Sequence, residues 1–268
     1  MGFWREMTDL RTEVTLPALL PDLTRREVGT PELMDDPGCD LRALYRTYAQ
    51  FGTVNALVSG WRQVYLQELR PHLSPARPNT LLDVGCGGGD VPRQLAHWAA
   101  QDGLTLRVTA IDADERAIGY ARAQSPVSGL HFRQVLSSDL VQEGRQYDFL
   151  TSNHLLHHLQ APELTGLLRD CEALCRVKTV HSDIERSALA YAAFGAAITP
   201  FFQGSFIRPD GLLSIRRSYT AGELRAAAPQ GWTVRRQFPY RNLLMYSPHG
   251  AAFSHLNAAS QDAAGPDA

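Results

Sequence analysis

Cysteine is scarce in this chain of 268 residues, and its spacing excludes common uses of the residue. The chain has four cysteines, which form no CxxC pair and have no histidine at the spacing of a zinc site. No signal peptide is recognisable, so we expect free thiols, no bound metal and a reducing, cytoplasmic setting. Cys171 and Cys175 lie one helical turn apart, a spacing at which their two thiols could bind a metal ion. Two small apolar residues on the buried face of a helix is the simpler interpretation.

An excess of basic residues and a long apolar run are also missing. The formal net charge is -2 with both signs interspersed, so no basic stripe could follow a phosphate backbone, and a nucleic-acid substrate is disfavoured. The apolar stretch from Ala188 to Phe202 is interrupted by Gly195 and Pro200, and falls short of the roughly 20 residues of a membrane span. We expect a soluble protein, without integral membrane association, that acts on a small molecule. This apolar stretch could cover a hydrophobic substrate or contact a partner.

The chain divides into three predicted parts. Within residues 1–70, a lead-in precedes apolar and aromatic residues that recur at three- and four-residue steps up to Leu69. This periodicity, interrupted around Gly52 and Gly60, predicts two helices or one kinked helix that form a lid before the core. Residues 71–246 form the core domain. Residues 247–268, poor in large apolar side chains, are predicted to be a disordered tail.

Strands and helices alternate through the core. Apolar runs predict strands at 80–84, 106–111, 130–136, 147–152 and 179–184, and amphipathic patterns predict helices at 91–100, 115–123 and 162–174. This alternation is typical of an α/β fold with a doubly wound parallel sheet. Farther on, Thr220-Ala221-Gly222-Glu223 is a capping box before a short helix. Two last strands, at 232–238 and 243–246, predict an antiparallel pair that completes a mostly parallel seven-stranded sheet.

The first predicted strand ends in a glycine-rich turn, Asp83-Val84-Gly85-Cys86-Gly87-Gly88-Gly89-Asp90. Glycine lets backbone approach a ligand closely, because it has no Cβ and tolerates positive φ. A dinucleotide site would have a third glycine at the position of Asp90, whose carboxylate opposes a pyrophosphate at the helix start. A nicotinamide-dependent oxidoreductase is therefore disfavoured. The leading Asp83 and the GxGxG pattern suit a ligand with a cationic amino group and no phosphate.

This turn resembles motif I of class I S-adenosylmethionine-dependent methyltransferases. The turn residues that the resemblance places under the methionine and ribose portions of S-adenosylmethionine are Gly85, Cys86, Gly87 and Gly89. It also implies that Asp83 orients the ammonium group of this cofactor, and that Asp112, at the end of the second strand, accepts hydrogen bonds from the ribose hydroxyls. Asp114 is an alternative ribose ligand, although its position favours an N-cap of the next helix.

The contact to the adenine edge is less defined. The family commonly has Asp or Asn followed by a small residue after the third strand, where this chain has Leu136-Ser137-Ser138-Asp139. Leu136 takes the usual acidic position, so Ser137 or Ser138 must supply the polar contact. Asp139 is either a further contact or an exposed turn residue.

A second segment, 147–159 with the sequence YDFLTSNHLLHHL, is similar to the fourth-strand motif of quinone-biosynthesis and natural-product methyltransferases. Its polar end falls at the carboxyl edge of the sheet, where open α/β sheets bind ligands, so Asn153 and His154 should lie near the sulfonium. His157 and His158 follow, and only one of these adjacent side chains is expected to face the cleft. A neutral imidazole there could take a proton from a phenol or enol; a histidine that only packs is the alternative.

Further polar and aromatic residues follow the fifth strand. His181 is another candidate base, and Asp183 is expected to pair with Arg186, with a cleft histidine as the alternative partner. Several aromatic residues could wall a hydrophobic pocket, although those before the core have helical spacing and favour ordinary core packing. These aromatic residues are Tyr48, Phe51, Trp61, Phe206 and Tyr219.

The resemblance covers about residues 80–185 and implies a Rossmann-like methyltransferase fold. It implies methyl transfer from S-adenosyl-L-methionine to a small aromatic or hydrophobic molecule, with O-methylation of a phenolic or quinol-like hydroxyl as the main expectation. C-methylation of an electron-rich ring would use the same base and pocket. A catalytically silent S-adenosylmethionine-binding scaffold would keep the glycine motif without needing the polar edge. The acceptor and the oligomeric state, for which a homodimer is one option, stay open.

Overall fold

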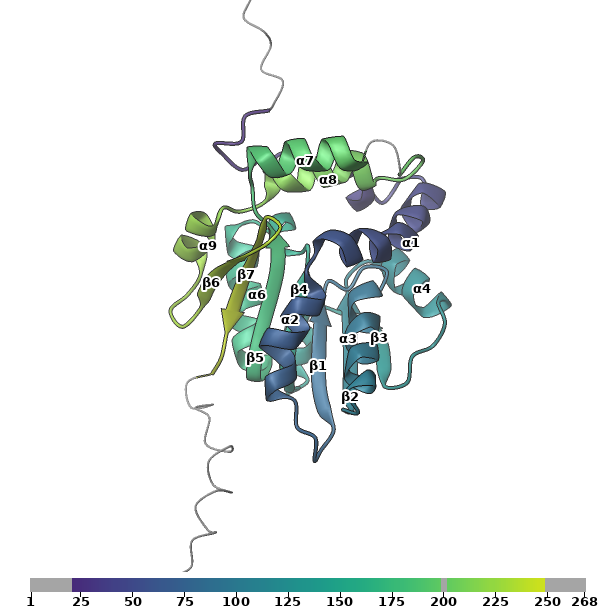
Figure 1. Ribbon diagram of the computed structural model, residues 1–268, viewed down its shortest axis with the longest axis vertical. Helices are drawn as coiled ribbons and strands as arrows, with labels where there is room; N and C mark the ends of the chain where they lie inside the picture. Colours follow the sequence, from purple (N-terminus) through teal and green to yellow (C-terminus); the bar gives the residue numbers. More distant parts are fainter. Residues whose placement is uncertain (1–20, 199–201, 249–268) are drawn as a thin grey trace, which may run out of the picture.

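The computed structural model describes residues 21–198 and 202–248. Within them, seven strands form one sheet in the order β3-β2-β1-β4-β5-β7-β6 (Figure 1). Strands β1 to β5 pair in parallel, and β7 runs antiparallel to both β5 and β6. This confirms the doubly wound, mostly parallel sheet. The strands are β1 (Asn79–Val84), β2 (Leu106–Asp112), β3 (Leu130–Gln134), β4 (Tyr147–Asn153), β5 (Cys175–Ile184), β6 (Thr233–Gln237) and β7 (Arg241–Tyr246).

Helices cover both faces of this sheet because successive side chains of a strand point to opposite faces. Leu81 of β1 packs with α2, α3 and α4, whereas its neighbour Leu82 packs with α5, α6 and α9. Burial on both faces explains the continuous apolar run of the central strand. The covering helices are α2 (Trp61–Val64), α3 (Asp90–Gln101), α4 (Glu115–Ala123), α5 (Ser137–Gln142), α6 (Ala161–Leu174) and α9 (Ala221–Ala227).

Two strand boundaries differ from the predicted ones. Strand β3 ends two residues earlier than expected, at Gln134, and β5 begins four residues earlier, at Cys175. The early start of β5 follows from its pairing with β4, in which Tyr147 lies opposite Cys175. Cys175 therefore opens a strand and does not share a helix with Cys171, which was the expectation. Both are buried free thiols.

Two helices precede the core, as predicted. Helix α1 (Leu41–Val58) continues through Gly52 and ends before Gly60, whose φ of 67° redirects the chain into α2 and the π-helical turn η2 (Tyr65–Leu69). The carboxylate of Asp40 accepts hydrogen bonds from the first backbone N–H groups of α1 and so caps it. The interruption expected at Gly52 is absent because the helix passes through that residue.

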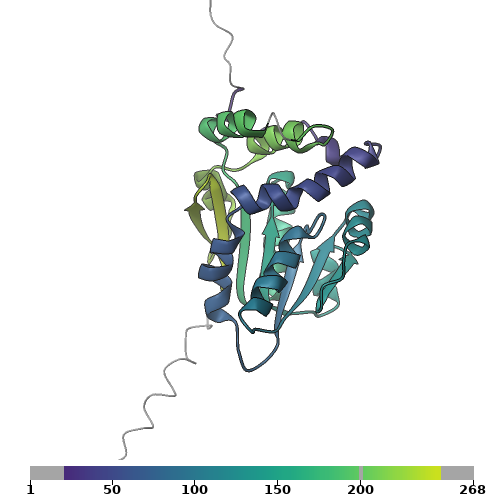
Figure 2. The ribbon, with the colours of Figure 1, turned by 45° about the vertical axis from the view of Figure 1, so that its right-hand side comes forward.

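Three helices lie over the carboxyl edge of the parallel strands (Figures 1 and 2). They are α1 and the adjacent pair α7 (Ala188–Ile198) and α8 (Ile207–Arg217). The cover thus comes from the N-terminal region and from the insertion after β5. Within the described ranges, no helix has both the length and the apolar character needed to cross a membrane. The predicted lead-in up to residue 20 and the predicted tail from residue 249 lie outside the described residues.

Candidate functional site

A cavity of about 1000 Å³ lies between the carboxyl edge of the sheet and the covering helices. The glycine turn after β1 and the ends of β2 and β4 line one part of it, and α7, α8 and the start of β7 line another. Ligand pockets in proteins commonly occupy roughly 300 to 1,000 Å³, so this cavity has room for a cofactor together with an acceptor.

The glycine turn presents its backbone to the cavity. Gly85, Gly87 and Gly89 have φ values of 68°, 51° and 80°, a region that other residues rarely adopt. A Cβ added at Gly87 would meet no protein atom within 4 Å, although this residue lines the cavity, so the space in front of it is open to a ligand. Gly85 and Cys86 also line the cavity. Gly89 does not, because it packs against Phe132, and its expected cofactor contact is corrected to a packing role.

Three carboxyl groups, the buried one of Asp83 and the half-buried ones of Asp90 and Asp112, line the same part of the cavity. Among the described residues, none of the three forms an ion pair with a basic side chain. Burial raises the pKa of Asp83 to about 7, with a smaller contribution from Asp90 and Asp112, while the hydroxyl of Thr151, which donates a hydrogen bond of 2.6 Å, lowers it. Burial also raises the pKa of Asp90 and of Asp112. This acidic environment favours a cationic ligand.

Asp112 also fixes the glycine turn. Its carboxylate accepts hydrogen bonds from the backbone N–H groups of Gly87, at 2.8 Å, and Asp114, at 3.0 Å. Asp114 accepts a bond from the N–H of Arg116 and caps α4, which confirms its expected structural role. Asp112 is therefore held at the end of β2 with its carboxylate at the cavity.

Of the residues expected near adenine, Ser137 and Ser138 both line the cavity. The hydroxyl of Ser137 donates a 2.6 Å hydrogen bond to Asp170. The carboxylate of Asp139 accepts a bond from the backbone N–H of Leu136 at the start of α5, so it is a helix-start residue. It does not appear in the cavity lining.

Asn55 of α1 is a cavity residue that the sequence analysis missed. Its amide N–H donates to Asp90 at 2.8 Å, and its amide oxygen accepts from Asn153 at 3.3 Å. Asn153, as expected, lies at the end of β4 in the cavity lining. The available signal was the position of this amide on the same helical face as Tyr48 and Phe51, which otherwise would be an apolar face.

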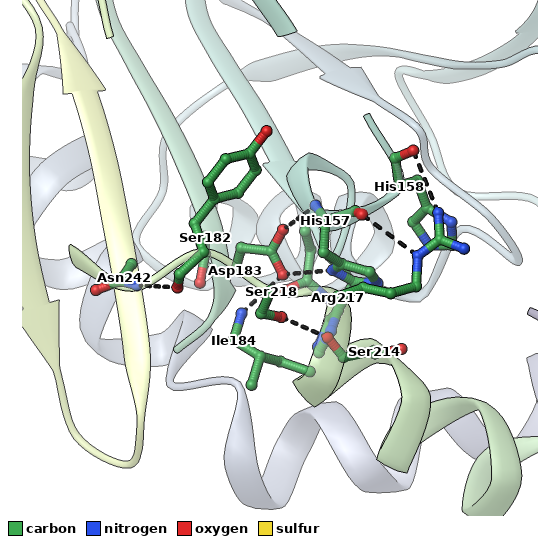
Figure 3. Close-up of polar contacts among 12 residues, drawn as sticks. His157, His158, Ser182, Asp183, Ile184, Ser214, Arg217, Ser218 and Asn242 are labelled. Atoms are coloured by element: carbon green, nitrogen blue, oxygen red, sulfur yellow. Dashed lines mark hydrogen bonds and ion pairs between the residues drawn. The ribbon is translucent and has the colours of Figure 1, made fainter. Parts of the chain in front are cut away.

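His157 and Asp183 form a buried pair at the ends of β4 and β5 (Figure 3). Nδ1 of His157 lies 2.7 Å from Oδ1 of Asp183, and the backbone N–H of His157 donates to the other oxygen at 2.9 Å. The expected pair of Asp183 with Arg186 is wrong. The guanidinium of Arg186 instead bonds to Glu223, at 2.6 Å, and to the carbonyl of Ser218. The alternative, a cleft histidine, is the partner of Asp183.

Glu32, another residue that the sequence analysis missed, approaches the opposite side of the ring. Its Oε1 lies 3.4 Å from Nε2 of His157 and accepts a hydrogen bond from Ser214 of α8. Burial alone would lower the pKa of His157, but Asp183 and Glu32 together raise it to about 9. Conversely, His157 holds the pKa of the buried Asp183 well below its usual range. His157 is therefore protonated at neutral pH in this arrangement, and Nε2 becomes a base only when its proton has left.

The two histidines beside His157 also line the cavity. The expectation that only one of His157 and His158 faces the cleft is wrong, because both belong to the 3-10 turn η4 (Leu156–His158) and their rings lie 4.4 Å apart. His154 has a φ of 55°, and its Nε2 lies 2.9 Å from Nη1 of Arg241. Burial and Arg241 lower the pKa of His154 well below its usual value, so its ring is neutral and accepts from the guanidinium. This contact makes His154 a weak candidate base.

His181 lies away from the cavity and is corrected as a candidate base. Its ring is fully buried, lies 2.7 Å from the hydroxyl of Ser152 and stacks on Trp232. Burial lowers its pKa to about 4. Of the expected aromatic walls, Tyr48 and Phe51 line the cavity, whereas Trp61, Phe206 and Tyr219 pack outside its lining.

The histidines also bear on the expectation that no metal binds. Donor atoms of Glu32, His157 and His158 lie within 4.8 Å of one another, as do those of His154, His157 and Asp183. In the second group, Asp183 already holds Nδ1 of His157 through a hydrogen bond. The absence of a metal requirement therefore remains a prediction.

This chain is similar in sequence to known methyltransferases. Residues 81–178 match a family model described as a methyltransferase domain. The ubiquinone biosynthesis O-methyltransferase of Bordetella parapertussis is 33% identical over 144 residues, which is 53% of this chain and 51% of that protein. The protein of the same name from Paraburkholderia phytofirmans is 29% identical over 166 residues, or 57% and 67% of the two chains. The chain thus spans about half the length of the first of these relatives.

Solved structures share the fold. Human N-acetylserotonin methyltransferase in complex with S-adenosylmethionine has a TM-score of 0.56 at 13% identity, covering 83% of this chain and 62% of that one. The plantazolicin methyltransferase BpumL in complex with S-adenosylhomocysteine has a TM-score of 0.52 at 13% identity, covering 80% and 92%. The fold is therefore the Rossmann-like methyltransferase fold. Residues 81–178 are therefore similar to a methyltransferase domain, and the sheet around them has the fold of class I S-adenosylmethionine-dependent methyltransferases.

Proposed function

We propose that this chain binds S-adenosylmethionine in the cavity and transfers its methyl group to the hydroxyl of a phenolic or quinol-like small molecule. The observation that carries the proposal is that one cavity is lined by the glycine turn, by the three acids beside it and by His157, whose Nδ1 is held by Asp183. The curated relatives, which are named as ubiquinone biosynthesis O-methyltransferases, support transfer to oxygen.

The cofactor suits the residues that would hold it. S-adenosylmethionine carries an ammonium and a sulfonium, and Asp83, Asp90 and Asp112, which form no ion pair within the described part of the chain, favour positive charge. The open space before Gly87 admits the ligand close to the backbone. Asp112 would accept hydrogen bonds from the ribose hydroxyls, and Ser137 or Ser138 would contact the adenine edge.

Methyl transfer needs little chemistry from the protein beyond orientation and proton removal. The bound cofactor supplies a methyl group activated by a positively charged sulfur. The acceptor oxygen forms the new bond to carbon while the carbon–sulfur bond breaks and its electron pair stays on sulfur. The proton of the hydroxyl passes to Nε2 of neutral His157. Asp183 keeps the proton of that neutral ring on Nδ1, so the lone pair is on Nε2, the atom that faces Glu32.

Turnover with a panel of phenols and quinols tests the proposal. We expect S-adenosylhomocysteine and a methylated product to form together, with the methyl group on oxygen when the product is examined by NMR. His157→Gln should lower turnover at least about a hundredfold while cofactor affinity stays within about threefold, because the base is lost and the cofactor residues remain. His97→Gln, at an exposed position of α3, is the matched control. Added EDTA should leave turnover unchanged.

Each contrary result would change a different part of the proposal. A methyl group on ring carbon would support C-methylation, the alternative that uses the same pocket. Cofactor binding without any methylated product would favour a silent scaffold. Wild-type turnover in His157→Gln would remove this residue from the mechanism.

A further inference from the structure

The guanidinium of Arg241 is buried in the cavity lining without a carboxylate partner. The residue is 2% exposed, and no ion pair joins it to an acid among the described residues. Its N–H groups donate only to uncharged acceptors. These are the hydroxyl of Ser182, at 3.2 and 2.9 Å, the amide oxygen of Asn153, at 2.6 Å, and Nε2 of His154, at 2.9 Å.

Among the described residues, no carboxylate contacts the positive charge of Arg241. Burial lowers the pKa of Arg241 to about 10, which still leaves it charged at neutral pH. The carboxylate of Asp183 has the strongest electrostatic interaction with Arg241, but both of its oxygens bond to His157. Burying a charge is costly unless an opposite charge compensates it. The hydrogen bonds account for four of the five N–H groups, and the fifth is on Nη1, beside His154.

His154 holds this part of the guanidinium in place. Its backbone has a φ of 55°, a left-handed conformation that is uncommon for residues other than glycine, and its N–H donates to the carbonyl of Ser182. Such a conformation costs of order 1 to 3 kcal/mol and is concentrated at functional sites. Here it directs a neutral imidazole at Arg241, so the guanidinium is fixed without being neutralised.

The guanidinium of Arg241 lies at the ends of β4 and β5, where Asn153 is the predicted cofactor residue that it contacts. Its backbone begins β7, and β4 and β5 lie between β7 and β1, which at roughly 4.8 Å per strand places this backbone, though not the guanidinium, about 14 Å from the strand that carries Asp83. The pair His157–Asp183, by contrast, is at the end of the neighbouring β5. Apolar side chains of α7, including Ala190 and Phe194, line the cavity as well.

We propose that Arg241 binds an anionic oxygen of the acceptor. The acceptors are therefore phenols or quinols that carry a second, ionised oxygen, a carboxylate or a phenolate, beside the hydroxyl that is methylated. This inference rests on the proposed function and specifies its substrate class. A charge-assisted hydrogen bond from Nη1 in a site partly lined by apolar side chains supplies both affinity and selection for charge.

Binding of matched ligand pairs to the protein loaded with S-adenosylhomocysteine tests this inference by calorimetry. One pair is 4-hydroxybenzoate and its methyl ester, which differ in a carboxylate. The other is 4-nitrophenol, at a pH where it is ionised, and 4-nitroanisole, which differ in a phenolate. We expect the wild type to bind an anionic member at least about tenfold more tightly than its neutral partner, and the pair that shows the preference identifies the oxyanion as carboxylate or phenolate.

Three variants separate anion binding from structural support. Arg241→Met should lose the preference while the Kd for S-adenosylhomocysteine changes by less than about threefold. Arg241→Lys keeps the positive charge and should retain part of the preference for the anionic ligand. This variant tests the inference if Arg241→Met does not fold. Arg186→Met is the control, because Arg186 is equally buried but pairs with Glu223 outside the cavity lining, and it should keep the full preference.

The contrary outcomes are distinct. Equal affinities within both pairs, no binding of any of the four ligands, or a preference that survives in Arg241→Met would each overturn the inference. A loss of S-adenosylhomocysteine affinity in Arg241→Met with the preference intact would instead assign Arg241 to the cofactor carboxylate. A wild-type protein that does not bind S-adenosylhomocysteine would count against the proposed function.

Discussion

The protonation state of His157 depends on two carboxylates that come from distant parts of the chain. Asp183 belongs to β5 and fixes Nδ1, whereas Glu32 precedes α1 and faces Nε2. Both stabilise the imidazolium, which raises the pKa of His157 to about 9 although burial opposes it. An acceptor hydroxyl must compete with Glu32 for Nε2, so Glu32 controls when His157 can act as a base.

Glu32→Gln should therefore change the pH profile of turnover. In the wild type, log(kcat/KM) should rise with pH and level off near 9, because the free enzyme must lose the proton of His157. Removing the charge of Glu32 destabilises the imidazolium, so the rising limb should move to lower pH. Glu27→Gln is the control, since Glu27 lies in the same segment but pairs with Arg216. A limb that stays in place in Glu32→Gln would contradict the role of Glu32.

Asp83 should make cofactor binding depend on pH. Its pKa of about 7 in the free protein means that a proton must leave before the carboxylate meets the cofactor ammonium. Affinity for S-adenosylmethionine should rise as the pH rises through about 7, then level off. Calorimetry in buffers of different ionisation enthalpy should show proton release below that point. Asp83→Asn should bind more weakly and without this dependence, and a pH-independent wild type would refute the prediction.

The residues that could be predicted from the sequence are those within local motifs. Asp83, Asp112 and His157 lie at or shortly after strand ends whose position the hydrophobic pattern already indicates. Glu32 and Arg241 had no such signal, because their contacts to His157 and His154 join segments far apart in the chain. The partner of Asp183 was predicted wrongly for the same reason, since a nearby arginine was favoured over a tertiary contact.

At the scale of elements, the turn between β1 and α3 combines backbone shape with ligand access. Its positive φ values at Gly85, Gly87 and Gly89 satisfy the change of direction from strand to helix. Only part of the turn faces the cavity, since Gly89 packs against Phe132. The sequence pattern predicts the turn itself because glycine spacing is local, but the division between ligand contact and packing depends on β3, a separate strand.

Gly87→Val and Gly103→Val form a matched pair that separates these effects. Both glycines have positive φ, and at both positions a Cβ would meet no protein atom within 4 Å, so both variants should lose of order 1 to 2 kcal/mol of stability from backbone strain. Only Gly87 lines the cavity, and only its variant should lose cofactor affinity, by at least about a hundredfold. Calorimetry with S-adenosylmethionine measures this. Similar affinities in the two variants would remove Gly87 from the cofactor site.

The local conformation of η4 explains another departure from the sequence analysis. A regular helix would separate adjacent side chains by about 100°, so one of two neighbouring histidines would turn away from the cleft. The single 3-10 turn at the end of β4 instead presents both His157 and His158 to the cavity. Hydrophobic periodicity could not reveal this because the turn is too short to carry a repeat.

For the whole molecule, segments from three parts of the chain close over the sheet edge and bury the charges of the site. The segment before α1 is attached to α8 and to η4. The guanidinium of Arg26 donates to the carbonyls of His157 and Arg217, and that of Arg217 donates to the carbonyls of Thr30 and His158. These contacts hold Glu32 next to His157. Folding of the lid and protonation of the site are therefore coupled.

This coupling predicts how stability changes on the alkaline side. The pKa of His157 is about 9 in the folded protein and 6.5 for the unperturbed side chain. The folded state thus binds the extra proton between these values, and the stabilisation is lost as the pH rises through about 9. Urea unfolding should show a free energy of unfolding that falls by up to roughly 1.4 kcal/mol per pH unit in this window, less where water reaches the pair. His157→Gln should lack this decline, and an equal decline in both proteins would show that other groups control the alkaline stability.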